Sequence, residues 1–205
     1  MANNSNQAQP PLEYIAPQFN SLVLKLAKIV LPWWLKLQTN IDQIEVHNSD
    51  ILVKSYQQFQ QGKIRLLLAF RHPKVDDPLA LAKLFWHLLP QEAKKQNITL
   101  DTPVHVHFVY DRGIPLWAGK WAGWLFSRLG GSSILRGKLD LLGLKGARNL
   151  LVKGKFPLAI APEGATNGHN DIISPLEPGI AQLSFWCAED LQKDNREEEV
   201  VILPI

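Results

Sequence analysis

The sequence predicts an α/β domain in which a mostly parallel sheet is flanked by helices. Runs at 64–70, 104–110 and 200–205 are rich in residues that favour strands, and a shorter run lies at 157–161. Segments with helical periodicity separate these runs. Strands that are apolar throughout are buried on both faces, which is typical of a parallel sheet covered by helices.

The N-terminal part divides into two segments. Residues 1–17 are polar and then interrupted by prolines, so we expect a flexible tail. Residues 18–40 combine an apolar run with the pair Trp33 and Trp34, and this pattern is typical of an amphipathic helix in the headgroup region of a membrane. The alternative is an amphipathic helix packed on its own core. The lysines that interrupt the run are Lys25, Lys28 and Lys36.

Residues 41–205 form the expected globular domain. In its first half, Gly62 marks the end of one helix and Pro90 closes the next. The predicted elements of this half are a helix at 51–61, a strand at 64–70, a helix at 78–89 and a strand at 104–110.

The second half of the domain follows the same alternation. We expect a solvated surface at the charged stretch 189–199, and further elements of the fold after residue 205, because the chain stops inside an apolar strand. The predicted elements are a helix at 114–129, a loop at 130–133, a helix at 139–153, a strand at 157–161, a helix at 179–188 and a strand at 200–205.

Composition limits the classes of function. The net charge of +3 is too small to indicate nucleic-acid binding, but it is compatible with anionic headgroups or an acidic carrier protein. The single cysteine, Cys187, excludes an internal disulfide and is expected to be a small buried hydrophobic residue. His105 and His107 alternate on one strand, but a third ligand is not evident, so we expect no metal site.

Three tryptophans recur at helical spacing within 114–129, namely Trp117, Trp121 and Trp124. The simpler interpretation is one buried face of a helix. The alternative is a lining for an acyl chain or a wall that faces a membrane.

A histidine and an aspartate follow the first predicted strand, at the sheet edge where ligands bind in open α/β folds. A neutral imidazole at His72 can take a proton from an attacking hydroxyl, and Asp77 can orient the ring and stabilise its charged form. Asp77 followed by Pro78 is also a common helix start, with the aspartate as cap. Asp76 competes with Asp77 for either role.

Two more polar groups lie near predicted strand ends. Arg136 follows the glycine loop at 130–133, and Glu163 and Gly164 follow the strand at 157–161. Taken alone, Arg136 is compatible with a surface arginine and Glu163 with a turn residue.

The order of these motifs resembles the glycerolipid acyltransferase superfamily, which includes lysophosphatidate and glycerol-3-phosphate acyltransferases. His72-Pro-Lys-Val-Asp-Asp77 resembles the family's His-x4-Asp signature. The remaining resemblances are Gly130 to Arg136 to the second block, Ala161-Pro-Glu-Gly164 to the third and residues 202–205 to the fourth, so about residues 60–205 are covered.

The resemblance implies an O-acyltransferase of phospholipid biosynthesis that moves a fatty acyl group from a thioester to a hydroxyl of a lysolipid or glycerol-phosphate-type acceptor. His72 would be the general base, Asp77 its orienting partner, and Arg136 the ligand of the acceptor phosphate. Glu163 and Gly164 would order the acceptor site. The donor would be a thioester of acyl carrier protein or coenzyme A, without a metal or further cofactor, at the cytoplasmic face of a membrane and without a nucleic-acid partner.

The chain departs from the family pattern at the acceptor site. The family's third block continues with Thr-Arg, whereas this chain has Ala165 and Thr166, so an arginine that grips phosphate is absent. The phosphate ligand that remains is Arg136, helped by Lys138. The identity of the acceptor is then open, and the candidates are other lysolipids, neutral alcohols and glycolipids. Two smaller departures are Ala161 in place of Phe and Arg71 in place of the common Asn.

Two other functions remain open. One is a non-catalytic lipid-binding relative of the same fold, as the missing arginine suggests. The other is a hydrolase of esters or thioesters that uses the His72 and Asp77 pair with water. A serine hydrolase is disfavoured because the chain lacks a Gly-x-Ser-x-Gly motif.

Overall fold

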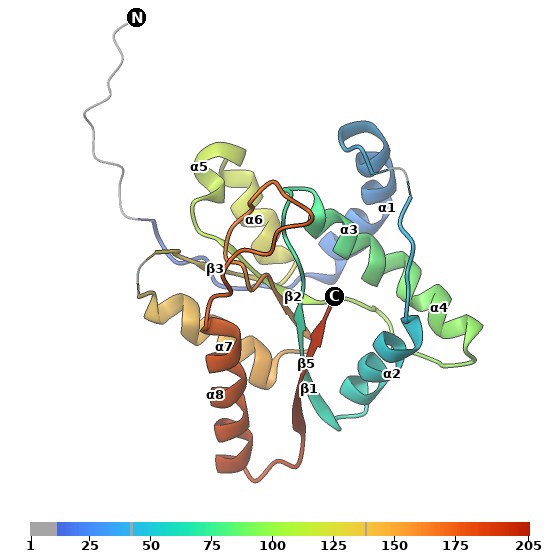
Figure 1. The fold of residues 1–205 in the computed structure, drawn as a ribbon, viewed down its shortest axis with the longest axis vertical. Helices are drawn as coiled ribbons and strands as arrows, with labels where there is room; N and C mark the ends of the chain where they lie inside the picture. Colours follow the sequence, from blue (N-terminus) through green and yellow to red (C-terminus); the bar gives the residue numbers. More distant parts are fainter. Residues whose placement is uncertain (1–11, 42, 138) are drawn as a thin grey trace, which may run out of the picture.

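The computed structural model describes residues 12–205 except 42 and 138. Within these residues five parallel strands form one sheet, in the order β3-β2-β4-β1-β5, so the predicted α/β class with a parallel sheet flanked by helices is confirmed (Figure 1). The strands are β1 (Ile64–Ala69), β2 (His107–Asp111), β3 (Gly131–Ile134), β4 (Leu158–Ile160) and β5 (Glu199–Pro204).

Helices cover both faces of this sheet. Along β1, Leu66 and Leu68 belong to one core cluster and Leu67 to the other, as alternation of side chains along a strand requires. The described helices are α1 (Ser21–Gln38), α2 (Ser49–Gln60), α3 (Asp77–Lys83), the π-helix η1 (Leu84–Leu88), α4 (Leu89–Lys95), α5 (Ile114–Ala118), α6 (Lys120–Arg128), α7 (Leu141–Lys153) and α8 (Gly179–Lys193).

The two cores differ in the helices that supply them. Residues of α1, α2, α3, η1 and α4 pack on the face that carries Leu66 and Leu68, whereas α7 and α8 pack on the face that carries Leu67. Cys187 is a free, fully buried thiol in the second core, as predicted. Because all strands are parallel, their carboxyl ends lie at one edge, where ligands bind in open α/β sheets.

Pro90 does not end its helix, contrary to prediction. The helix continues to Lys95, and η1 lies ahead of the proline, where the N–H of Leu89 reaches the carbonyl of Leu84. A proline lacks an N–H and its ring crowds the carbonyl one turn earlier in an α-helix. The wider π turn accommodates this change without breaking the helix.

The predicted loop at 130–133 is in large part a strand. Gly131 to Ile134 pair with Phe108 to Asp111 of β2, and a side chain at Gly131 would meet the ring of Phe108. Ser133 is buried and its Oγ accepts the N–H of Ile15 at 2.8 Å. Polar side chains can therefore be buried in this edge strand, because the segment before α1 supplies their hydrogen-bond partners.

Residues 14–18 are accordingly not a free tail. The hydroxyl of Tyr14 lies 3.0 Å from that of Ser132, and the N–H of Gln18 bonds to the carbonyl of Ser127 at 2.9 Å. These contacts tie the segment to β3 and α6. Residues 1–11 of the predicted tail lie outside the described part of the chain.

Two further helix predictions need correction. The single helix at 114–129 is divided into α5 and α6 by Gly119, whose φ of +87° ends α5. The helix at 179–188 continues to Lys193 because Leu191 is buried in the second core, so part of the charged stretch is a packed helix. In the described chain, no helix is long and apolar enough to cross a bilayer.

Candidate functional site

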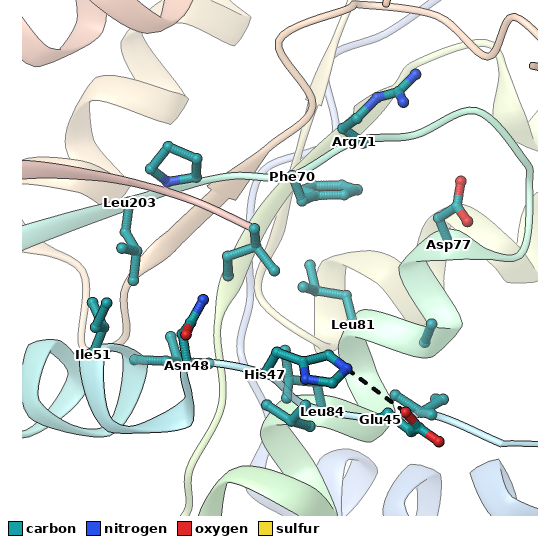
Figure 2. Close-up of a pocket in the computed structure, with 16 residues that line it drawn as sticks. Glu45, His47, Asn48, Ile51, Phe70, Arg71, Asp77, Leu81, Leu84 and Leu203 are labelled. Atoms are coloured by element: carbon teal, nitrogen blue, oxygen red, sulfur yellow. Dashed lines mark ion pairs between the residues drawn. The ribbon is translucent and has the colours of Figure 1, made fainter. Parts of the chain in front are cut away.

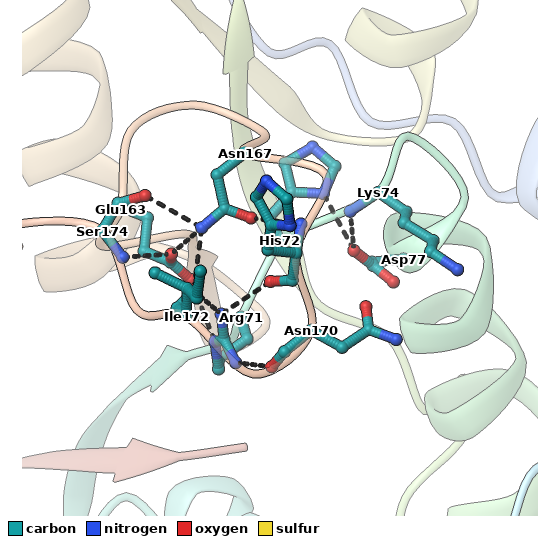
Figure 3. Close-up of polar contacts among 10 residues, drawn as sticks. Arg71, His72, Lys74, Asp77, Glu163, Asn167, Asn170, Ile172 and Ser174 are labelled. Carbon is teal, nitrogen blue, oxygen red and sulfur yellow. Dashed lines mark hydrogen bonds and ion pairs between the residues drawn. The ribbon is translucent and has the colours of Figure 1, made fainter.

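His72 and Asp77 lie side by side in the turn between β1 and α3. Their atoms Nδ1 and Oδ2 are 3.6 Å apart, and both side chains are about three-quarters buried, at 24% and 29% exposure. The backbone N–H of Lys74 donates to the same Oδ2 at 2.6 Å and fixes the carboxylate. The turn therefore brings together the two residues that the spacing predicted as a pair (Figure 3).

A helix starts at Asp77, as the alternative predicted, but Asp77 is not its cap. Asp76 occupies the N-cap position of α3, whereas Asp77 is the first helical residue and bonds back to the preceding turn. Nδ1 of His72 is directed at Asp77, so the other ring nitrogen, Nε2, faces away from this carboxylate. A slight approach of the two side chains would turn the 3.6 Å separation into a hydrogen bond.

Glu163 is buried after β4, and described neighbours surround its carboxylate. Oε2 accepts the N–H of Ser174 at 2.9 Å and the side-chain amide of Asn167 at 3.2 Å. Oε1 accepts the Nε–H of Arg71 at 3.1 Å. These hydrogen bonds, first from Ser174 and then from Arg71, hold the pKa of Glu163 below its usual range. Glu163 therefore anchors the loop 164–176 as an ionised carboxylate.

Arg71 is the other anchor of this loop. Besides Glu163, its guanidinium donates to the carbonyl of Ile172 at 2.7 Å and to the carbonyl of Asn170 (Figure 3). The loop also crosses the His72 turn, because the N–H of Gly168 bonds to the carbonyl of Pro73 at 3.0 Å.

In the sequence, Arg71 was notable only as a departure from the family pattern. The sequence did contain a signal for the ion pair, because Arg71 follows one predicted strand and Glu163 follows another. The two residues can be paired only once β1 and β4 are known to be neighbours, and apolar runs do not give the order of the strands.

Arg136 and Gly164, both predicted site residues, are in direct contact. The guanidinium donates from Nη1 to the carbonyl of Gly164 and from Nε to the carboxylate of Asp111. Asp111 is itself held by the N–H of Gly113 at 2.6 Å. Arg136 thus connects the ends of β2 and β4, and it is about half exposed. Lys138, the predicted helper of Arg136, lies outside the described residues.

An apolar pocket of about 520 Å³ lies beside the His72 turn, and it was not predicted. Asp77 and Arg71 are part of its lining. Figure 2 shows that the rest of the wall comes from the segment 44–48 before α2, from α2, α3 and η1, and from the ends of β1 and β5. Its apolar lining includes Ile51, Phe70, Leu81, Leu84 and Leu203.

The tryptophans of α5 and α6 do not form a buried face. Trp117, Trp121 and Trp124 are 73%, 60% and 55% exposed. The break at Gly119 makes two short helices that present these rings to the outside. The interpretation as an internal helix face is therefore wrong, and an outward-facing wall remains.

His105 and His107 are buried groups of the core. Nε2 of His105 lies 2.8 Å from the carbonyl of Leu129, and its Nδ1 accepts the indole N–H of Trp86 at 2.9 Å. Nδ1 of His107 lies 2.9 Å from the carbonyl of Gly130. Both imidazoles are thus engaged within the fold.

The chain matches no protein-family model, and no curated protein matches it significantly. The fold and the side chains define a parallel α/β domain with a histidine and carboxylate pair at the carboxyl end of a strand inside the sheet.

Proposed function

We propose that this protein is a membrane-associated O-acyltransferase of the glycerolipid acyltransferase type. It transfers a fatty acyl group from a thioester of acyl carrier protein or coenzyme A to a hydroxyl of a lipid acceptor. The observation that carries the proposal is the contact of His72 with Asp77, 3.6 Å apart, beside an apolar pocket at the carboxyl end of β1. The order of the four sequence motifs supports it.

In the proposed reaction His72 acts through the ring nitrogen that faces away from Asp77. This nitrogen takes the proton of the acceptor hydroxyl while the hydroxyl oxygen attacks the thioester carbonyl carbon. The new C–O bond forms, the C–S bond breaks, and the leaving thiolate takes up the proton from the imidazolium. Asp77 stabilises the imidazolium and keeps the ring in its orientation.

The apolar pocket would hold the acyl chain of the donor. Burial of an acyl chain contributes about 0.8 kcal/mol for each methylene group. Since Asp77 and Arg71 lie at the wall of the pocket, a chain bound there places its thioester end near His72. The pocket is continuous with the catalytic turn, because α3 begins at Asp77 and the pocket is lined by Leu81 of α3 and Leu84 of η1.

Membrane contact would occur through α1 together with α5 and α6. These helices contain no acidic residue, and α1 carries Lys25, Lys28 and Lys36. α1 packs on α3 and α6, and α5, α6 and the loop after β4 lie at the end of the molecule to which the strands point (Figure 1). The exposed apolar side chains of these helices include Leu22, Leu26, Ile29, Trp33 and Trp34 of α1 and the three tryptophans of α5 and α6.

In the proposed interfacial position the acceptor would reach the site from the membrane, and we propose that this is the cytoplasmic face. Tryptophan and lysine beside apolar residues suit the headgroup region. A wall of lipid would also keep water from the thioester and favour transfer over hydrolysis.

The test is acyl transfer from labelled acyl-coenzyme A and acyl carrier protein to a panel of lipid alcohols in vesicles. His72→Gln is expected to abolish transfer while vesicle binding and the melting temperature stay near those of the wild type. Wild-type binding to vesicles without transfer to any acceptor would instead support a non-catalytic lipid-binding protein. Release of free fatty acid at the same rate with and without acceptor would support a hydrolase.

A further inference from the structure

We infer that the acceptor is an uncharged lipid alcohol, such as a monoacylglycerol or a glycolipid, and not a phosphorylated lysolipid. This inference rests on the proposed acyl transfer and names the acceptor class of the same site. It comes from the contacts of the arginines around the His72 turn.

Three arginines near the carboxyl ends of the strands are already paired with carboxylates. A phosphate is best recognised by an arginine that presents two N–H groups in a fork. Here each of the three guanidinium groups already donates to a carboxylate of the protein. The pairs are Arg71 with Glu163, Arg136 with Asp111, and Arg112 with Asp140.

Arg136 is the decisive case because it matches the phosphate ligand of the family. Its Nε bonds to Asp111 and its Nη1 to the carbonyl of Gly164. Asp111 is fixed by the N–H of Gly113 at 2.6 Å, so its carboxylate is held beside the guanidinium. A phosphate at Arg136 would meet this like charge and would have to displace existing hydrogen bonds.

The turn and the loop around His72 give a phosphate little further support. Lys74 is followed closely by the carboxylates of Asp76 and Asp77. Thr166 is exposed on the loop where the family pattern has an arginine. A dianionic headgroup near these carboxylates would be repelled, whereas a neutral headgroup would not.

The loop that covers the turn suits hydroxyl groups instead. Residues 164–170 contain only small, amide, hydroxyl and imidazole side chains, without a formal charge at neutral pH. Asn170 and His169 are exposed next to backbone carbonyls that Arg71 holds in place. Amide and imidazole groups donate and accept hydrogen bonds, as a glycerol or sugar hydroxyl requires.

The experiment compares monoacylglycerol with lysophosphatidate of the same acyl chain, in phosphatidylcholine vesicles with one acyl donor. The wild type is expected to prefer monoacylglycerol in kcat/KM by at least about tenfold, which corresponds to about 1.4 kcal/mol. A preference for lysophosphatidate would overturn the inference while leaving the acyl transfer intact. Absence of transfer to every alcohol would overturn the proposed function and the inference with it.

A gain of phosphate recognition provides the second measurement. Thr166→Arg restores the cation of the family's third block on an exposed loop position, and Thr166→Gln is its uncharged control. Thr166→Arg is expected to shift the ratio of kcat/KM values towards lysophosphatidate by about tenfold relative to Thr166→Gln. Equal ratios for the two variants would show that charge at this site does not select the acceptor, and would overturn the inference.

Discussion

Oε1 of Glu163 accepts the Nε–H of Arg71 at 3.1 Å, and this ion pair joins the segments that follow two neighbouring strands. β1 and β4 pair in parallel with Ala69 opposite Ile160, so the chain leaves both strands side by side. The glutamate that resembles a family acceptor-site residue is thus turned towards the arginine and the loop 164–176. In the proposed reaction Glu163 would position the wall of the site and would not have to touch the acceptor.

Arg71→Met is expected to loosen the loop 164–176. The substitution removes the donors to Glu163 and to the carbonyls of Asn170 and Ile172, so limited proteolysis should cut this loop several times faster. The KM for the acceptor should rise more than kcat falls, because the His72 turn is retained. Arg71→Lys should rescue little, since one ammonium cannot reproduce the planar fork. A protease-resistant loop in Arg71→Met would contradict the anchoring role.

Asp77→Asn is expected to lower kcat by roughly 10²- to 10⁴-fold, because the imidazolium formed at His72 loses its stabilising charge. Asp76→Asn is the matched control, as it removes the adjacent carboxylate from the N-cap position. The two variants should be compared by kcat and by melting temperature. A similar loss of kcat in both variants would show that the effect reflects the general charge of the turn and not the pairing with His72.

The sequence predicted the His72 and Asp77 pair because the pair is local. Four intervening residues between a strand and a helix close one turn, and a proline after Asp77 starts the helix. The ion pair of Arg71 with Glu163 spans 92 residues and depends on which strands are neighbours. Apolar runs identify strands but not their order, so this contact was not predictable.

The same limit explains the missed strand β3. Gly131, Ser132 and Ser133 lack the composition of a strand, and their pairing with β2 is stabilised by Tyr14 and Ile15 from far upstream. The exposure of Trp117, Trp121 and Trp124 depends on the backbone at Gly119, which helical spacing alone does not reveal. Tertiary contacts decided both cases, whereas the apolar pattern sufficed for the fold class.

Gly146→Ala is expected to destabilise the fold by about 1–3 kcal/mol, because a methyl group there would overlap the hydroxyls of Tyr14 and Ser132. The control is Gly179→Ala on another helix, where an added Cβ meets open space. This control should be neutral or stabilising by up to about 1 kcal/mol. Urea denaturation of both variants measures the difference. Equal free energies of unfolding would mean that the segment before α1 shifts to accommodate the methyl group with little loss of stability.

Charge reversal on α1 is expected to weaken binding to anionic vesicles. Lys25 and Lys36 are exposed, and each lysine near an anionic surface contributes about 1 kcal/mol, so the double change to Glu should reduce binding by at least roughly tenfold. The double change of Lys94 and Lys193 to Glu, on exposed positions of α4 and α8, is the control with the same net charge. Vesicle co-sedimentation at fixed salt separates the two. Equal losses would indicate a general charge effect without a role for α1.

The free energy of unfolding is expected to fall as the pH drops below about 6.5, because His105 is held neutral in the core. Burial lowers the pKa of His105 from its ordinary 6.5 to about 3, and burial also lowers the pKa of His107. The unfolded chain therefore binds a proton between pH 6.5 and 3 that the folded chain does not. Stability rises with pH across this window, by up to about 1.4 kcal/mol per unit for one such histidine, and levels off above it.

Two measurements check this expectation. Urea denaturation from pH 5 to 8 should give a slope that ends near pH 6.5, above the range in which Glu163 and other carboxylates titrate. NMR of the imidazole nitrogens should show the ring of His105 still neutral at pH 5, bonded to Trp86 through Nδ1 and to the carbonyl of Leu129 through Nε2. Titration of this ring near pH 6.5 in the folded protein would contradict the buried, neutral imidazole and the pH dependence derived from it.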